Sequence, residues 1–478
     1  MNEEPNQTTE KLINSENVSV KSNKSRDRDS LTNPTKEDVE FLQTIRKLPW
    51  YRRLFRVMDT GSLRGVIVMW IRMTLGIGIL TLPYYVKQYG GVIGVAIIVI
   101  AALVNFMAYV FIFDAAFTTN KKNYPDLIKE LLGNRVLSVF KLTFILDITS
   151  TMMIYCIVSW NLLEYIIYFF GIGEQYWDEW IIDKDRLIFD EMHPTIFKIR
   201  GAFFYGIFLL TIPLFLKKNL EALQKVTIGY LFALFLLVGI ILCEMPFFSK
   251  AYKDEDINFN YFKKPDFNWI ECFFGLCISF YVQPFIFSLK GELLLPSRAR
   301  TRKISSISVS IEAIIFIVLG FFGYFTLGDK YTPNLLILRK PYPNKNYYSE
   351  LAFRFAIALF FLLNTLGLAM YNPSLRDYLD KYITMRNQRV KFILLSLLPF
   401  FIICTTSFLY PYIIDVTNFF GVTVYNFNGY LIPIMMKIAI LKRNNASWWK
   451  MFIAYFFLLV FIAMGVSGLI FRCLGWVN

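Results

Sequence analysis

Long apolar runs occupy most of this chain, and they limit its possible folds more than any other feature. Most of them exceed the roughly 20 residues that a helix needs to cross the hydrocarbon core of a bilayer. The backbone has no water to bond there, so such runs form helices. We therefore predict an all-α polytopic membrane protein with eleven transmembrane helices, at 62–86, 92–115, 136–170, 199–216, 226–248, 269–289, 304–328, 351–375, 390–409, 411–441 and 450–474.

Composition agrees with a membrane protein and excludes several other classes. Hydrophobic residues make up 56% of the chain, more than the 45–50% typical of soluble domains. The formal net charge is +14, but the basic residues lie in short loops between apolar runs, where such charge usually sets orientation. We expect the lipid bilayer, and no nucleic acid, as the partner of these loops. The six cysteines show no spacing typical of a metal site, so we expect no metal and no cofactor.

The polar segment at the start of the chain gives an expected orientation. Residues 1–48 contain one aromatic residue, Phe41, and are predicted to form a disordered cytosolic tail, followed by a juxtamembrane lead-in at 49–61. No apolar signal-peptide core precedes the first span, so that span is expected to direct insertion. With the tail inside, the inner loops hold 20 Lys or Arg and the outer loops hold 13. An odd number of helices then places the C-terminus outside or in a lumen.

Two of the predicted helices carry residues that interrupt helical backbone. The first contains "GIGILTLPYYV", in which Gly76 and Gly78 each weaken a helix by about 1 kcal/mol and Pro83 removes a backbone donor. The sixth contains "GLCISFYVQPFIFSLK", with a glycine, a serine, a glutamine and a proline at mid-span. One Gly-x-Gly alone can reflect close helix packing. Paired interruptions five helices apart, however, are typical of the substrate site in a transporter built from a five-plus-five inverted repeat.

Several motifs resemble the amino acid/auxin permease family of the amino acid/polyamine/organocation superfamily. They are "GIGILTLPYYVKQYGG" in the first run, "SFYVQPFIFSLKGEL" with the basic loop "RARTRK" in and after the sixth, "GYFTLGDKYTPNLL" after the seventh and "NPSLRDYL" after the eighth. The resemblance covers about 62–475. It implies a transporter domain of the leucine-transporter type, with a 5+5 inverted repeat, broken helices 1 and 6, and one extra C-terminal helix.

The interrupted backbone is the predicted site for an amino acid, because unpaired main-chain groups and half-helix dipoles suit a carboxylate and an ammonium group. One polar face of the third helix carries Asp147, Ser150, Thr151 and Tyr155, and such a face lies toward the bundle interior. The predicted substrate-binding residues are Gly76, Ile77, Gly78, Tyr155, Ser279, Phe280 and Tyr281.

A permanent cation beside the first interruption argues against sodium coupling. The sodium-coupled branch of the family has an Asn four residues before the first glycine, where this chain has Arg72, and its Cys-His pair would fall at Ile278 and Ser279. A simpler alternative is that Arg72 extends toward the cytosolic interface. We expect Arg72 to replace a bound ion. The predicted coupling and gating residues are Arg72, Asp147, Asn364, Thr365 and Glu312, the last as a proton carrier.

The sequence thus favours a secondary-active amino acid transporter that works by alternating access, proton-coupled or uniport rather than sodium-coupled. Its expected partners are an amino acid substrate and protons, in a plasma, vacuolar or lysosomal membrane. An amino-acid-sensing membrane protein without net transport is the alternative. A membrane-embedded enzyme is disfavoured because the only histidine, His193, lies in an outer loop.

Overall fold

In the part of the chain that the computed structural model describes, all regular secondary structure is helical. This part comprises 62–75, 77–121, 123–169, 259–266, 268–293, 295–331, 347–368, 371–380, 383–410 and 412–477, with short helical stretches such as 211–215 and 235–240 and scattered residues between 202 and 246. Seven helices in it are long and apolar enough to cross a membrane, which makes this an integral, multi-pass membrane protein. The total of eleven stays a prediction, since 199–216 and 226–248 are described only in part.

The first span is broken, as predicted. Helix α4 (Leu63–Thr74) ends at mid-span, a short 3₁₀ helix η2 (Ile77–Thr81) follows, and α5 (Leu82–Tyr89) completes the crossing. Pro83 lies in the first turn of α5, where its missing N–H has no intrahelical partner to lose. The chain thus restarts a helix at the proline instead of bending one around it.

The sixth span is broken at the same depth, and the two breaks touch. Helix α11 (Asn268–Ile278) ends before a turn, and the 3₁₀ helix η4 (Gln283–Phe285) leads into α12 (Ile286–Gly291). A Cβ on Gly78 would lie 2.4 Å from Ser279 Oγ, so only a glycine fits there. The paired interruption predicted from the sequence is therefore a point of direct contact.

The predicted third and eighth spans differ from the structure. Helix α7 (Tyr124–Phe169) begins twelve residues earlier than the predicted 136–170, and Gly133, with φ of 86°, divides off its first turns. The prediction of a single helix at 351–375 is wrong, because the structure has two helices there. Helix α14 (Tyr347–Leu368) ends, and α15 (Asn372–Leu379) begins after a break. Proline in the first turn of α15 explains the break, since it cannot donate within a continuous helix.

The remaining described spans lie close to their predicted positions. They are α6 (Gly91–Thr119), α13 (Arg298–Tyr331), α16 (Gln388–Leu409), a tenth span made of α17 (Ile413–Phe420) and α18 (Ile432–Arg443) with irregular turns between, and α19 (Trp448–Val477). The irregular turns are two π-helical segments, η6 (Gly421–Tyr425) and η7 (Phe427–Leu431).

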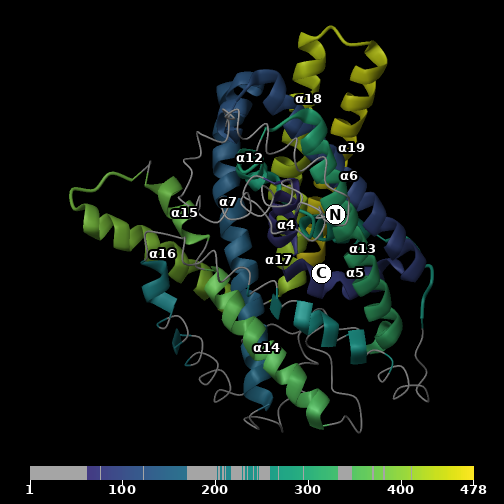
Figure 1. The fold of residues 1–478 in the computed structure, drawn as a ribbon, viewed down its shortest axis with the longest axis vertical. Coiled ribbons are helices and arrows are strands. Elements are labelled where there is room, and N and C mark those ends of the chain that lie inside the picture. The colour runs from purple at the N-terminus through teal and green to yellow at the C-terminus, as the bar shows by residue number, and fades with distance from the viewer. Residues whose placement is uncertain are drawn as a thin grey trace, which may run out of the picture.

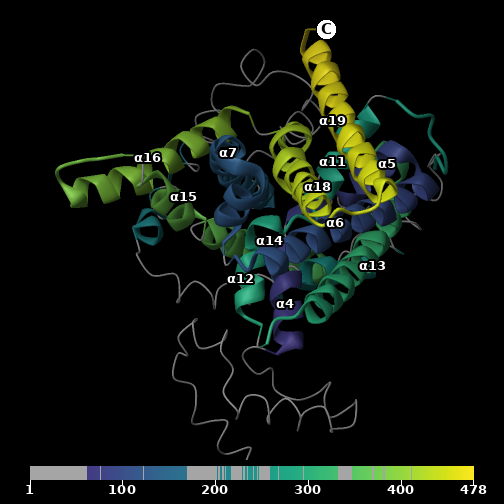
Figure 2. The ribbon, with the colours of Figure 1, turned by 90° about the horizontal axis from the view of Figure 1, so that it is seen from above.

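The helices pack in two groups around the broken spans. On one side α13 packs along α6 and against α4 and α5, and on the other α14 and α16 pack on α7 (Figures 1 and 2). The tenth span contacts both α7 and α11, while α19 packs on α18, η6 and α11 at the edge. This arrangement leaves the two breaks facing α7 and the tenth span.

Loops predicted to share one side of the membrane do lie together. Arg298 donates to the Thr118 hydroxyl, and Arg443 pairs with Glu130, so three predicted inner loops meet at one end of the bundle. At the predicted outer side, the Gly91 N–H donates to the Asn260 carbonyl.

Candidate functional site

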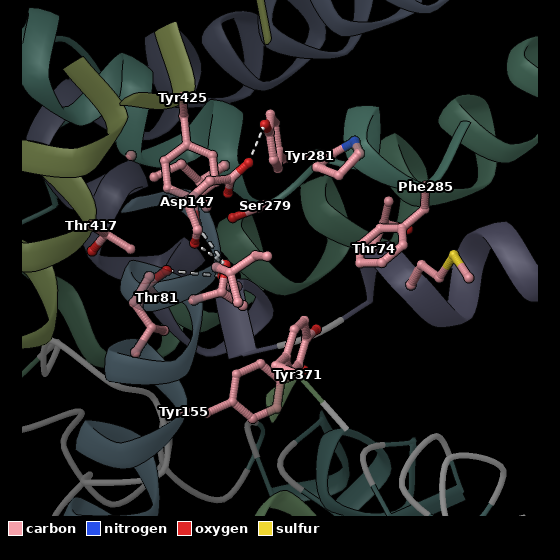
Figure 3. Close-up of a pocket in the computed structure, with 18 of the residues that line it drawn as sticks. Thr74, Thr81, Asp147, Tyr155, Ser279, Tyr281, Phe285, Tyr371, Thr417 and Tyr425 are labelled. Carbon is pink, nitrogen blue, oxygen red and sulfur yellow. Dashed lines mark hydrogen bonds between the residues drawn. The ribbon is translucent and has the colours of Figure 1, made fainter. Parts of the chain in front are cut away.

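A cavity of about 300 Å³ lies where the two broken spans face α7 and the tenth span (Figure 3). That volume is at the lower end of the range of small-molecule sites. Its polar and aromatic lining includes Thr74, Gly78 and Thr81 from the first span, Asp147, Thr151 and Tyr155 from α7, Ser279 and Tyr281 from the sixth span, Tyr371, and Thr417 and Tyr425 from the tenth.

The hydroxyl of Ser279 is the free polar group at the break in the sixth span. Ser279 is buried, lines the cavity, and its Oγ has no hydrogen-bond partner among the described residues. The backbone N–H groups of Ser279 and Phe280 are not free, because they donate to the carbonyls of Leu276 and Cys277 in tight turns. A ligand at this break therefore meets a side-chain hydroxyl first, where the sequence had predicted open backbone amides.

Phe280 lies outside the cavity, in contrast to its predicted place in the side-chain pocket. Its ring is fully buried against Phe316, with 4.6 Å between ring centroids, and its carbonyl accepts a hydrogen bond from the Tyr109 hydroxyl. Phe280 therefore stabilises the break in the sixth span through its contacts with Phe316 and Tyr109, on the side away from the cavity. Gly76 and the side chains of Arg72 and Ile77 lie outside the described residues.

Asp147 is the charged residue among the described residues that line the cavity, and its donors are neutral. The Tyr281 hydroxyl donates to Asp147 Oδ2 over 2.7 Å, and the Tyr425 hydroxyl bonds to Ser150 and Thr151 on the same helix. Asp147 is only 3% exposed, so a carboxylate there needs hydrogen bonds or a cation to offset its lost hydration. Figure 3 shows the Asp147 and Tyr281 side chains directed toward one another, with Ser279 beside them.

Aromatic rings form two walls of the cavity. Tyr281 and Tyr425 meet edge to face with centroids 4.5 Å apart, and Tyr155 lies 5.3 Å from Tyr371. Tyr155, Tyr281 and Asp147 were predicted from the sequence as site residues, and all three line this one cavity. Tyr371 and Tyr425 were not. Two features of the sequence could have indicated them: Pro373, two residues after Tyr371, and the polar residues of "TNFFGVTVYNFNG" around Tyr425.

The other predicted coupling residues lie outside the cavity wall. Asn364 donates to Ser159 Oγ over 2.7 Å and Thr365 donates to the same oxygen over 3.3 Å, so both join α14 to α7 away from Asp147. Glu312 on α13 is fully buried and accepts a hydrogen bond from the Thr74 hydroxyl, which itself lines the cavity. A second carboxyl group thus lies directly behind the wall at the break of the first span.

Comparison with known proteins identifies relatives over most of the chain. A family model described as "Transmembrane amino acid transporter protein" matches residues 59–477. The "Putative amino acid transporter AAT1" of Plasmodium falciparum (isolate 3D7) is 23% identical over 348 residues, and that of Plasmodium berghei (strain Anka) is 22% identical over 347. Each alignment covers 71% of this chain and 52% of the relative, so the chain spans about half the length of the curated relatives it matches.

A solved structure supports the architecture. The fold resembles that of MhsT, whose crystal structure was determined in complex with L-phenylalanine, with a TM-score of 0.51 at 13% identity. The match covers 86% of this chain and all of that one. At this identity the likeness shows the fold alone.

Proposed function

The chain belongs to the transmembrane amino acid transporter family, and on that premise we propose that it carries amino acids across a membrane by alternating access. The transport is secondary-active and either proton-coupled or uniport. It does not use sodium, because Arg72 replaces the asparagine of the sodium-coupled branch. The sequence-based resemblance to amino acid permeases is confirmed by the family match.

The observation that carries this proposal is the cavity at the contact of two broken spans. Broken helices that meet at mid-membrane leave polar groups where lipid cannot reach, which is how transporters of this architecture hold substrate. Here the free Ser279 hydroxyl, Gly78 and the Asp147 carboxyl group line one cavity. A buried hydroxyl that lines a cavity and has no partner in the protein is open to a hydrogen bond from a ligand.

We assign the substrate's backbone to the breaks. Ser279 binds one of its charged ends, and the backbone of 76–78 binds the other. Tyr155 and Tyr281 shape the side-chain space, while Phe280 holds the sixth-span break in place. The proposed substrate-binding set is Gly76, Ile77, Gly78, Tyr155, Ser279 and Tyr281.

We assign coupling to charged and polar groups around the same breaks. The charge on Asp147 must be neutralised before the cavity can close to either side, since an unpaired charge in the membrane is costly. Arg72 supplies a fixed cation near the first break, and Glu312 bonds Thr74 at its edge. Asn364 and Thr365 hold α14 on α7 during the change of access.

Uptake into proteoliposomes tests the function. The purified full-length chain should accumulate or exchange radiolabelled amino acids, and replacement of external sodium by choline at fixed pH and membrane potential should leave the initial rate unchanged. An inward proton gradient should raise the rate if the protein is proton-coupled and leave it unchanged if it is a uniporter. Saturable sodium dependence would overturn the proposed coupling. Binding of amino acids without exchange would identify a sensor instead.

A further inference from the structure

The two ionisable carboxyl groups described at the cavity are not matched by a basic residue in its described lining. Asp147 lies in the wall, and Glu312 lies behind Thr74, while the described lining contains no lysine or arginine. Within the described side chains, no cationic group lies within 4.0 Å of Asp147, and the hydrogen bond to its carboxyl group comes from the neutral hydroxyl of Tyr281. An amino acid backbone is a zwitterion with no net charge, so it leaves this acidic charge uncompensated.

We infer that the substrate is a cationic amino acid, such as lysine, ornithine or arginine, whose side-chain cation pairs with Asp147. This inference rests on the proposed function and names the substrate class for the same cavity. The backbone of the substrate binds at the Ser279 break, and its side chain extends along α7.

The cavity extends along α7 far enough for a long substrate, and its Asp147 end suits a cation. Asp147 and Tyr155 both line it and are eight residues apart on α7, which corresponds to about 12 Å along the helix axis. Aromatic rings flank the acidic end, since Tyr281 and Tyr425 meet edge to face beside Asp147. Aromatic faces attract ammonium and guanidinium groups, and a charge-assisted hydrogen bond to the carboxylate then fixes the cation.

The hydrogen bond from neutral Tyr281 orients the Asp147 carboxylate without neutralising its charge. The Tyr281 hydroxyl donates to Oδ2, and Tyr281 is itself held by a close packing partner, Gly429, on which a Cβ would lie 3.1 Å from its ring. A bound cation therefore meets a carboxylate already oriented by its neighbours. The rival partner for this charge is Arg72 of the same chain, and the two assignments predict opposite substrate profiles.

Ligand competition on the purified full-length chain decides between them. Binding of radiolabelled L-lysine is competed with unlabelled L-lysine, and with L-norleucine, which has the same carbon chain without the amine. We expect lysine to bind at least about 30-fold more tightly, as for truncation of one partner of a buried charge pair. Asp147→Asn should remove this difference by weakening lysine alone, and Asp147→Glu should restore part of it. Glu130→Gln, an exposed change on the same helix, should leave lysine affinity unchanged.

The outcomes separate this inference from the proposed function. Norleucine binding as tightly as lysine in the unmutated protein would overturn the inference while leaving amino acid transport intact. Equal loss of lysine and norleucine binding in a folded Asp147→Asn variant would also overturn it. That result would identify Arg72 as the ion-pair partner of Asp147. Lysine binding without uptake would support the inference and overturn transport. If Asp147→Asn does not fold, the lysine-to-norleucine ratio of the unmutated protein decides alone.

Discussion

Gly78 and Ser279 come from spans separated by about two hundred residues, and their contact is the tightest test of the site at the residue scale. A Cβ on residue 78 would lie 2.4 Å from Ser279 Oγ, 2.9 Å from its Cβ and 3.1 Å from its Cα. Gly78→Ala should therefore destabilise the folded protein by about 1–3 kcal/mol, as overpacking does. It should also push the two breaks apart and abolish amino acid uptake.

Thermal unfolding in detergent and uptake by the same preparation measure both effects. Gly239→Ala is the matched control, because a Cβ there meets nothing within 4 Å. Adding Ser279→Gly to Gly78→Ala removes two of the three contacts and should recover stability, but not uptake, since it also deletes the free hydroxyl. Normal uptake by Gly78→Ala would refute the proposed site.

At the scale of single elements, a partly buried arginine, Arg472, pairs α19 with two acidic residues of the bundle. Arg472 pairs with Glu271 on α11 over 3.0 Å and with Asp415 on α17 over 2.6 Å. Arg472→Gln leaves the buried Glu271 carboxylate without its cation and should lower stability by about 2 kcal/mol or more. The thermal unfolding midpoint in detergent measures this loss.

A surface ion pair and a compensating change are the controls for Arg472. Arg443 and Glu130 pair with half-exposed side chains, so Arg443→Gln should cost less than about 1 kcal/mol. Glu271→Gln in the Arg472→Gln background should recover part of the stability, because the buried charge is then gone. Equal midpoints for Arg472→Gln and Arg443→Gln would show that α19 is held by apolar packing alone.

The elements also show what the sequence could and could not predict. The breaks at Gly78 and Ser279 were predictable because glycine and proline act on their own local backbone. Phe280 was misplaced since the direction of a side chain in an irregular turn depends on its neighbours, here Phe316 and Tyr109. Tyr425 was missed because hydropathy does not distinguish a π-helical turn from an α-helical one.

At the scale of the whole molecule, orientation follows from loop charge, and the structure supplies exposed positions to test it. Ser447 lies in a predicted inner loop and Lys264 in a predicted outer one, and both are exposed. In a cysteine-depleted chain expressed in cells, Ser447→Cys should react with an impermeant maleimide once the plasma membrane alone is permeabilised. Lys264→Cys should react in intact cells if the protein is in the plasma membrane, and only after full solubilisation if it is in a vacuolar or lysosomal membrane.

Labelling of both positions under the same condition would contradict the predicted topology of a cytosolic N-terminus and alternating crossings. The same experiment identifies the membrane, which the sequence leaves open. Val466→Cys, on the exposed apolar face of α19, is the control that should stay unlabelled in sealed membranes.

The two π-helical segments of the tenth span give this helix spare length. A π turn closes its hydrogen bond over one more residue than an α turn, so 421–431 hold more chain than an α-helix of the same height. Rewinding one such turn to α geometry would lengthen the helix by about 1.5 Å per residue gained and rotate everything beyond it by about 100°. Tyr425 lies within that stretch. A change between π and α winding there would therefore change the direction of the Tyr425 ring beside Asp147, without a bend in the span.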